Sequence, residues 1–174
     1  MEILRIAIAG SVGAGKTSFI RTISEIEAVD TDKNSTDELA LLKSKTTVAL
    51  DFGLLTIVPN QVVHLYGTPG QPRFDFMWDI LIRQVHACIL LVDAHRPEHF
   101  HYGTQILNFV NQRVQIPILI GLTHTDCPRT VEPEKIAIAL GLQNLNHQPP
   151  LTAVNPNQKA SITEALNLII PKII

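Results

Sequence analysis

A glycine-rich loop between an apolar run and a helix-like stretch constrains this chain more than any other feature. Residues 10–17 read Gly-Ser-Val-Gly-Ala-Gly-Lys-Thr, after the apolar run 3–9 and before the stretch 18–26. In this G-x-x-x-x-G-K-[ST] pattern the glycines let backbone N–H groups turn inward around a phosphate, and the following helix adds its positive dipole end. The setting predicts a nucleoside triphosphate site on a strand–loop–helix unit. A flexible glycine-rich turn is the alternative.

Each position of the loop has an expected role. Lys16 is predicted to reach the β- and γ-phosphates and to take part in catalysis, and the Thr17 hydroxyl is predicted to bind Mg²⁺. The other nucleotide contacts in this segment are assigned to Gly10, Gly13, Ala14, Gly15 and Ser18.

Length and charge limit the class of protein. The 174 residues fit one domain over 1–174, and the 45% of apolar residues is typical of a globular protein. A formal charge of −2 gives no basic field for nucleic acid or anionic lipid. No signal peptide, membrane span or lipid anchor is indicated. Two cysteines, Cys88 and Cys127, suggest no disulfide framework, which predicts a cytoplasmic protein.

Apolar runs of strand length alternate with helical patterns along the chain. Strands separated by helices are expected to be parallel with right-handed crossovers. The candidates 46–58 and 62–66 are joined too closely for a parallel crossover and must be antiparallel. The fold is therefore predicted as an α/β P-loop NTPase G domain, with a mostly parallel six-stranded sheet, one antiparallel strand and helices on both faces. The strand candidates are 4–9, 46–58, 62–66, 87–92, 116–122 and 151–154, and the helix candidates are 16–26, 73–83, 97–112, 133–140 and 161–170.

Three further segments lie at the ends of expected strands, where such sheets bind ligands. Residues 47–52 read Thr-Val-Ala-Leu-Asp-Phe, residues 67–74 read Gly-Thr-Pro-Gly-Gln-Pro-Arg-Phe, and residues 123–126 read Thr-His-Thr-Asp. Together with the phosphate loop they resemble, in order and over nearly the whole chain, the motifs of the Ras-like small GTPases. The resemblance implies GTP and GDP as ligands, with Mg²⁺ as cofactor.

The first of these segments resembles the first switch of the family, in which a Thr precedes a strand with Asp-Phe. The resemblance implies that Thr47 is a catalytic residue and metal ligand, which meets Mg²⁺ and the γ-phosphate and orders the loop only when the triphosphate is bound. Thr46 is the fallback for this role. A threonine-rich start to a strand is the plain structural alternative.

The second segment resembles the second switch. The resemblance places the Gly70 N–H at the γ-phosphate and makes Gln71 the residue that orients the attacking water. Gly67 departs from the family, because it replaces an Asp that holds Mg²⁺, in most members through water. The bacterial MglA-like branch also lacks that Asp, so the chain resembles this branch, which implies a roadblock/LC7-type partner. The loss is expected to weaken Mg²⁺ binding and to leave it to Thr17, Thr47 and phosphate oxygens.

Val12 is a second departure, because many Ras-like loops have a small residue there. Its branched side chain is expected to crowd the space beside the γ-phosphate where Gln71 or an arginine must act. Intrinsic hydrolysis is therefore predicted to be slow, on the order of 10⁻³ s⁻¹ or below. An activating protein is one source of the arginine, and Arg73 or Arg83, which flank the expected helix 73–83, are the sources in cis.

The third segment resembles the guanine-recognition motif. The Asp126 carboxylate accepts from guanine N1–H and the exocyclic amine, a donor pair that adenine lacks. Thr123 takes the first place of the motif, as in the Rho branch, and His124 replaces a Lys that packs along the base. Residues 152–154 resemble Ser-Ala-Lys, which implies that the Ala153 N–H meets the guanine carbonyl oxygen. A polar loop with a helix-capping Asp is the alternative.

Two further groups of residues have weaker interpretations. His95 and His99 have a zinc-like i, i+4 spacing, but Pro97 lies between them and no third ligand stands at a fixed spacing. Solvated loop histidines are the preferred interpretation. An apolar face on the helix after the second switch fits either the core or a partner surface; its members are Phe74, Phe76, Trp78 and Ile82.

The predicted function is a GTP-binding molecular switch that hydrolyses GTP slowly to GDP and phosphate. A GTPase-activating or effector protein is expected as partner, and the GDP-bound form is expected to be a monomer. One alternative is a scaffold that binds guanine nucleotide but does not hydrolyse it. The other is a P-loop kinase, which the low total of 14 Lys plus Arg disfavours because a substrate lid needs clustered arginines.

Overall fold

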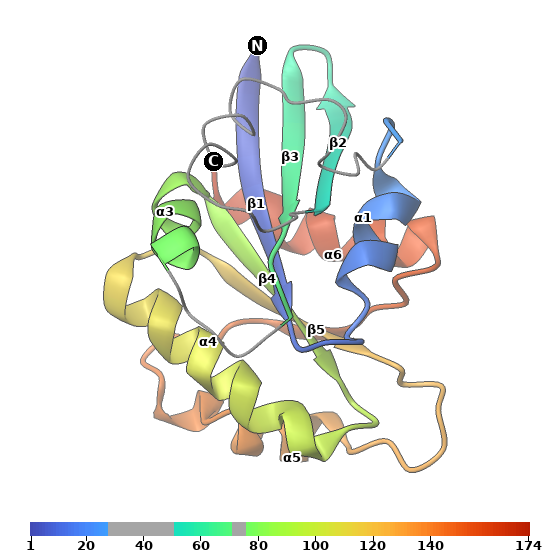
Figure 1. Ribbon diagram of the computed structural model, residues 1–174, viewed down its shortest axis with the longest axis vertical. Coiled ribbons are helices and arrows are strands. Elements are labelled where there is room, and N and C mark those ends of the chain that lie inside the picture. Colours follow the sequence, from blue (N-terminus) through green and yellow to red (C-terminus); the bar gives the residue numbers. More distant parts are fainter. Residues whose placement is uncertain (28–50, 71–75) are drawn as a thin grey trace.

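A six-stranded sheet with helices on both faces forms the centre of the molecule (Figure 1). The computed structural model describes residues 1–27, 51–70 and 76–174. The strands are β1 Glu2–Gly10, β2 Asp51–Val58, β3 Gln61–Gly67, β4 Ala87–Asp93, β5 Ile118–Thr123 and β6 Leu151–Ala153, and the helices are α1 Lys16–Ile23, α3 Phe76–Gln84, α4 Phe100–Arg113, α5 Pro133–Ala139 and α6 Lys159–Ile169. Three short 3₁₀ turns, Pro97–His99, Leu142–Asn144 and Ile170–Lys172, complete the regular structure of these ranges.

The sheet has the strand order β2-β3-β1-β4-β5-β6. β1 is parallel to both β3 and β4, and β5 is parallel to β4 and β6. β2 is antiparallel to β3, across a turn in which Asn60 has a φ of 72°. The predicted mostly parallel sheet with one antiparallel strand is confirmed. Of the strand expected at 46–58, residues 46–50 lie outside the described residues.

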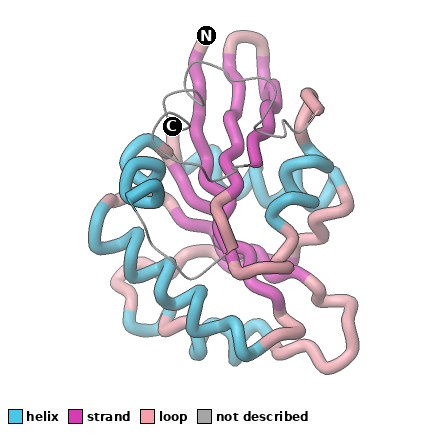
Figure 2. Tube along the Cα trace, in the orientation of Figure 1, coloured by secondary structure: helices cyan, strands magenta, loops and turns pink. Residues whose placement is uncertain are grey.

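Two hydrophobic clusters lie on opposite faces of the sheet, between the strands and the helices. Figure 2 shows the helices that cover the strands. Ile6 and Ile8 of β1 pack in the cluster with α1 and α6, whereas Ala7 and Ala9 pack in the cluster with α3, α4 and α5. Alternate residues of a strand point to opposite faces, so β1 contributes to both clusters. Helices on both faces are thus confirmed. None of the helices within the described ranges combines the length and apolarity of a membrane span.

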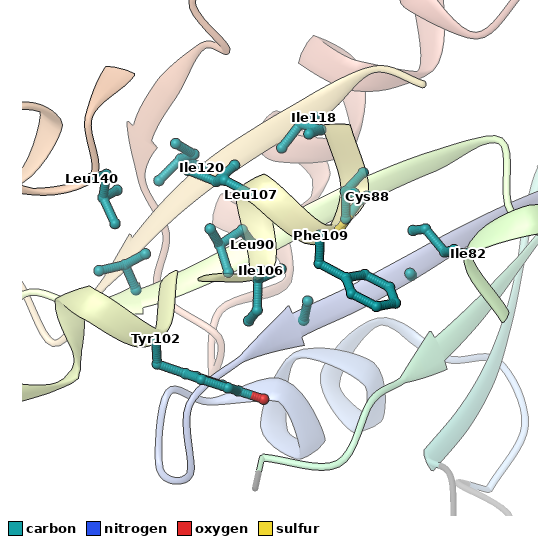
Figure 3. Packing of buried hydrophobic residues seen from close by; sticks show 14 of the residues in the cluster. Ile82, Cys88, Leu90, Tyr102, Ile106, Leu107, Phe109, Ile118, Ile120 and Leu140 are labelled. Carbon is teal, nitrogen blue, oxygen red and sulfur yellow. The ribbon is translucent and has the colours of Figure 1, made fainter. Parts of the chain in front are cut away.

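The cluster beneath α4 shows that part of the apolar face predicted on the helix 73–83 belongs to the core. Trp78 and Ile82 are each 1% exposed, and Trp78 makes an edge-on contact with Phe109, with ring centroids 5.8 Å apart. Both belong to the core, while Phe74 and the side chain of Phe76 lie outside the described residues. Figure 3 shows another part of the same cluster, with Cys88 and Leu90 of β4 and Ile118 and Ile120 of β5 near Ile106, Leu107 and Phe109 of α4.

Local chemistry explains where several elements differ from the expected bounds. α1 ends at Ile23 rather than near 26, because Ser24 turns to an extended conformation and its hydroxyl accepts from the Leu54 N–H at 3.1 Å. Pro97 opens a 3₁₀ turn, and the α-helix begins only at Phe100. β5 begins at Ile118, directly after a proline that has no N–H to donate to a strand ladder.

Candidate functional site

The predicted site segments gather at the carboxyl-terminal edge of the parallel strands. The phosphate loop follows β1, and the register pairs Gly10 at its start with Leu91 of β4. Asp93 at the end of β4 pairs with Thr123 at the end of β5, and Ala153 ends β6 beside Leu122. The four strand ends thus form one continuous edge, as the alternation of strands and helices predicted.

The phosphate loop needs glycine where it meets the chain around it. Gly10 has a φ of 149°, and a Cβ there would lie 2.5 Å from the carbonyl oxygen of Leu91. Gly15 has a φ of 106°, and its Cβ would lie 2.8 Å from Cγ of Pro156. The positive φ and the close neighbour each make a side chain unfavourable at these two positions.

The Lys16 ammonium lies inside the loop. The residue is 8% exposed, and its Nζ donates to the carbonyl oxygens of Gly10 and Ser11, both at 2.7 Å. Burial lowers the pKa of Lys16 to about 8, and the nearby Asp51 carboxylate partly offsets this effect. A polyphosphate in the loop would replace the solvation that this cation has lost, which fits the role predicted for Lys16.

Thr17 meets a carboxylate that sequence reasoning assigned no role. Its hydroxyl donates a hydrogen bond to Oδ2 of Asp51, from the start of β2. A hydroxyl and a carboxylate side by side are the oxygen ligands that Mg²⁺ prefers, so these residues fit the predicted ion. The described residues hold no cluster of three or more His, Cys, Asp or Glu, so they form no cage of protein ligands alone.

Gly70 lies against the phosphate loop, as its predicted role requires. A Cβ at Gly70 would lie 2.9 Å from the backbone N and Cα of Val12 and from its Cγ2. Val12 is 63% exposed, and its side chain therefore stands at the open side of the loop next to Gly70. This placement is consistent with the crowding expected from a branched side chain there.

Thr123 connects the segment 123–126, predicted to recognise the base, to the phosphate loop. It is fully buried, and its hydroxyl donates to the carbonyl oxygen of Ala14 at 2.7 Å. Asp126, three residues further along the chain, is exposed. A carboxylate there is free to meet a base that is held in register with phosphates in the loop.

The His124 imidazole turns inward. Its Nδ1 lies 3.0 Å from the Thr123 hydroxyl and 3.4 Å from Oδ1 of Asp93, which is 2% exposed. Because the Thr123 hydroxyl gives its proton to Ala14, Nδ1 is the nitrogen that carries a proton and donates. The ring is thus held from below by Asp93, a residue that no sequence pattern placed in the site.

The segment after β6 packs on the phosphate loop and α1. Ala153 is exposed at the strand end, while Val154, where the family has Lys, is 2% exposed and packs on Gly121. Pro156 is buried, and its carbonyl oxygen accepts from the Thr22 hydroxyl of α1 at 2.7 Å. Nothing in the sequence predicted that Pro156 supports the loop, because the contact joins residues far apart in the chain.

The structure does not favour Arg83 as an arginine acting in cis. Arg83 lies in the last turn of α3, just before β4 begins at Ala87. That is the amino-terminal edge of the sheet, at the opposite end of the strands from the phosphate loop. Thr47, Gln71 and Arg73 lie outside the described residues, so their roles stay predictions.

Comparisons with known proteins give an uncharacterized relative and a relative named as an ADP-ribosylation factor-like protein. An uncharacterized protein of Methanocaldococcus jannaschii is 29% identical over 94 residues, which span 53% of this chain and about half, 53%, of that protein. ADP-ribosylation factor-like protein 8b of Arabidopsis thaliana is 25% identical over 146 residues, or 82% of this chain and 72% of that protein. The two relatives share a modest identity with this chain.

A similar solved structure is that of the Arl6 BBS3 small GTPase of Trypanosoma brucei with the bound nucleotide analogue GppNp. The TM-score is 0.69 at 15% identity, over 98% of this chain and 97% of that one. The chain therefore has the fold of a P-loop small GTPase. A family model described as "Conserved hypothetical ATP binding protein" matches residues 26–172, beyond the phosphate loop at 10–17. Because the match covers most of its length, the chain belongs to this family of conserved hypothetical ATP binding proteins.

Proposed function

We propose that this protein is a guanine-nucleotide switch that binds GTP with Mg²⁺ and hydrolyses it slowly to GDP and phosphate. The observation that carries the proposal is the hydrogen bond between the Thr123 hydroxyl and the Ala14 carbonyl oxygen. It fixes the segment that bears Asp126 relative to the loop that would hold the phosphates. The sites for the base and for the phosphates would thereby be held at a fixed distance from each other.

ATP is the second candidate ligand, because the family description names it. Guanine is favoured by the exposed carboxylate of Asp126, which adenine would leave without its donor pair. The inward-turned His124 weakens one element of guanine recognition, because its ring does not offer the long aliphatic stem of a lysine. The choice of base therefore depends mainly on Asp126.

Slow turnover and a partner complete the proposal. Gln71 would orient the attacking water, and the Val12 side chain beside Gly70 would hinder the approach of an arginine. A GTPase-activating or effector protein, of roadblock/LC7 type if the chain belongs near the MglA-like branch, would then accelerate hydrolysis or read the switch. A non-hydrolysing scaffold is the alternative that Val12, Gly67 and Val154 support.

Affinities for GTP, GDP and ATP, with and without Mg²⁺, test the choice of nucleotide. We expect GTP to bind at least about tenfold more tightly than ATP, the cost of one unmatched polar group. Asp126→Asn should remove this preference, and Thr125→Ala, an exposed neighbour, should keep it. Tighter binding of ATP would overturn the guanine assignment and support the second candidate.

Phosphate release in a single turnover tests hydrolysis. Gln71→Leu should slow release and leave GTP affinity unchanged; equal rates would remove Gln71 from the mechanism. Release well above 10⁻¹ s⁻¹ without a partner would contradict the slow rate expected of an unassisted small GTPase. No release even with an excess of a roadblock protein would favour the scaffold.

A further inference from the structure

A carboxylate reaches the phosphate loop from a strand that is not adjacent to β1. Asp51 begins β2, and in the sheet β3 lies between β2 and β1. Its Oδ2 nevertheless accepts the Thr17 hydroxyl proton, and its charge acts on Lys16. These are the two side chains of the loop expected to hold the metal and the phosphates.

Gly67 makes this reach possible. It faces Asp51 in the antiparallel pair, so the two residues share one side of the sheet. A Cβ at Gly67 would lie 2.9 Å from Cβ of Asp51, closer than two such atoms approach. A side chain at position 67 and the present Asp51 side chain therefore exclude each other, and the carboxylate can stand on one strand or the other.

Gly53 brings α1 close to the same strand. A Cβ there would lie 2.7 Å from Cγ2 of Ile20 and 3.2 Å from Cβ of Ser24. Because this position carries no side chain, α1 packs directly on the β2 backbone. Thr17, in the first turn of α1, is thereby within hydrogen-bonding distance of Asp51.

Asp51 is not needed merely to attach β2 to α1. The far end of the helix already has that attachment, because the Ser24 hydroxyl accepts from the Leu54 N–H and the Glu25 carboxylate accepts from the Thr56 N–H at 3.1 Å and its hydroxyl at 2.9 Å. A negative charge beside a polyphosphate site is unfavourable unless a cation lies between the two. A carboxylate at this position would therefore be unfavourable if it only attached β2 to α1, whereas it suits a metal site.

We propose that Asp51 supplies the carboxylate of the Mg²⁺ site, from β2, in place of the side chain that Gly67 lacks at the end of β3. The Thr17 hydroxyl can donate its proton to Asp51 and still direct a lone pair toward Mg²⁺. The carboxylate then orients that ligand and adds the negative charge that a divalent cation needs. Mg²⁺ binding is therefore retained, in contrast to the weakening expected from Gly67 alone. The inference rests on the proposed nucleotide binding.

The test compares affinity for a fluorescent GDP analogue in excess Mg²⁺ and in EDTA. Mg²⁺ should tighten binding to the natural protein, and Asp51→Asn should reduce this gain by at least about tenfold, the usual effect of losing a group that supports a metal ligand. In EDTA the variant should bind GDP as tightly as the natural protein or more tightly, because a repulsive charge is gone. If Asp51 only attached β2 to α1, Asp51→Asn would weaken GDP binding by the same factor in both buffers, and this result would overturn the proposal.

Two further variants make the result specific to the carboxylate. Glu25→Gln removes the other acid that joins α1 to β2 and should leave the Mg²⁺ effect unchanged. Asp51→Gly combined with Gly67→Asp moves the carboxylate to β3 and should recover most of the effect, which Asp51→Gly alone should lack. If the double variant melts near the natural protein but does not recover the Mg²⁺ effect, the idea that the carboxylate can stand on either strand is wrong.

The experiment also separates this inference from the proposed function. Equal Mg²⁺ effects in Asp51→Asn and the natural protein, or no Mg²⁺ effect in either, would overturn the role of Asp51 while nucleotide binding stands. A natural protein that binds neither GDP nor ADP in either buffer would refute nucleotide binding itself. If ADP binds better than GDP, the same ratio of affinities measured with ADP decides whether Asp51 has this role.

Discussion

Replacement of Thr123 by valine should uncouple the base-recognition segment from the phosphate loop. The Thr123 hydroxyl is fully buried and donates to the Ala14 carbonyl oxygen at 2.7 Å. Valine keeps the shape but places a methyl group where the donor was. The carbonyl then either stays buried without a partner or turns toward solvent and distorts the loop whose N–H groups must surround the phosphates.

The expected magnitude follows from that lost partner. A buried acceptor left unsatisfied costs about 1–3 kcal/mol. In a chain of this size, each kcal/mol lowers the melting temperature by about 2–4 °C. If the loop distorts instead, nucleotide binding must restore it and bears the same cost, which weakens affinity by about 5- to 150-fold. The two effects share one source, so a variant that escapes one must show the other.

Melting temperature and GDP affinity should be measured on the same preparations. Thr123→Ser keeps the hydroxyl and should retain nearly all of the affinity. Thr163→Val removes a hydroxyl bond of similar length, 2.8 Å to the Lys159 carbonyl oxygen within α6, away from the phosphate loop and from Pro156. It should leave GDP affinity unchanged. If Thr123→Val melts with the natural protein and binds GDP within twofold of it, the coupling of the two segments through this hydroxyl is refuted.

Three further changes test other parts of the structure. Because the pKa of Lys16 is about 8 and phosphates need its charged form, nucleotide affinity should fall about fourfold from pH 7 to 8.5; binding titrations should show this, and a flat profile would refute it. Gly15→Ala should lower the melting temperature more than Gly13→Ala, since only the former meets Pro156 while both have positive φ; equal shifts would contradict the contact. Trp78→Ala should lower the free energy of unfolding by about 3–5 kcal/mol in urea titration, because the Trp78 side chain is buried in the core; a change below about 1 kcal/mol would contradict this burial.

The fold could be predicted because its signals are local. Alternating apolar strands and helical patterns indicated the parallel sheet, and the short link over 59–61 forced an antiparallel pair. Errors fell at element ends, where single contacts decide. The hydroxyl of Ser24, for example, ends α1 by bonding to Leu54, a residue of another strand that no local pattern reveals.

Half of the site could be predicted for the same reason. The phosphate loop is a contiguous motif with fixed backbone chemistry, so the places of Gly10, Gly15 and Lys16 followed from spacing alone. The supports of the site were missed because they come from distant segments. Asp93 near His124 and Pro156 against Gly15 are contacts between segments that lie at or after the ends of different strands, and each is visible only when the sheet is assembled.

The pairing of Asp51 with Gly67 shows why even a correct topology was not sufficient. Val58 pairs with Gln61 next to the turn, and a ladder continued from there without interruption would set Asp51 opposite Thr68. An irregularity between Thr56 and Val58 shifts the register by one residue and brings Asp51 opposite Gly67 instead. In the unshifted register Asp51 would face Thr68, which has a side chain of its own. Asp51 would then no longer lie opposite the space beside Thr17 that its carboxylate now reaches. The proposed metal site therefore depends on a bulge about 17 Å away along the strand, at about 3.3 Å per residue, and straightening that bulge should reduce the Mg²⁺ effect as Asp51→Asn does.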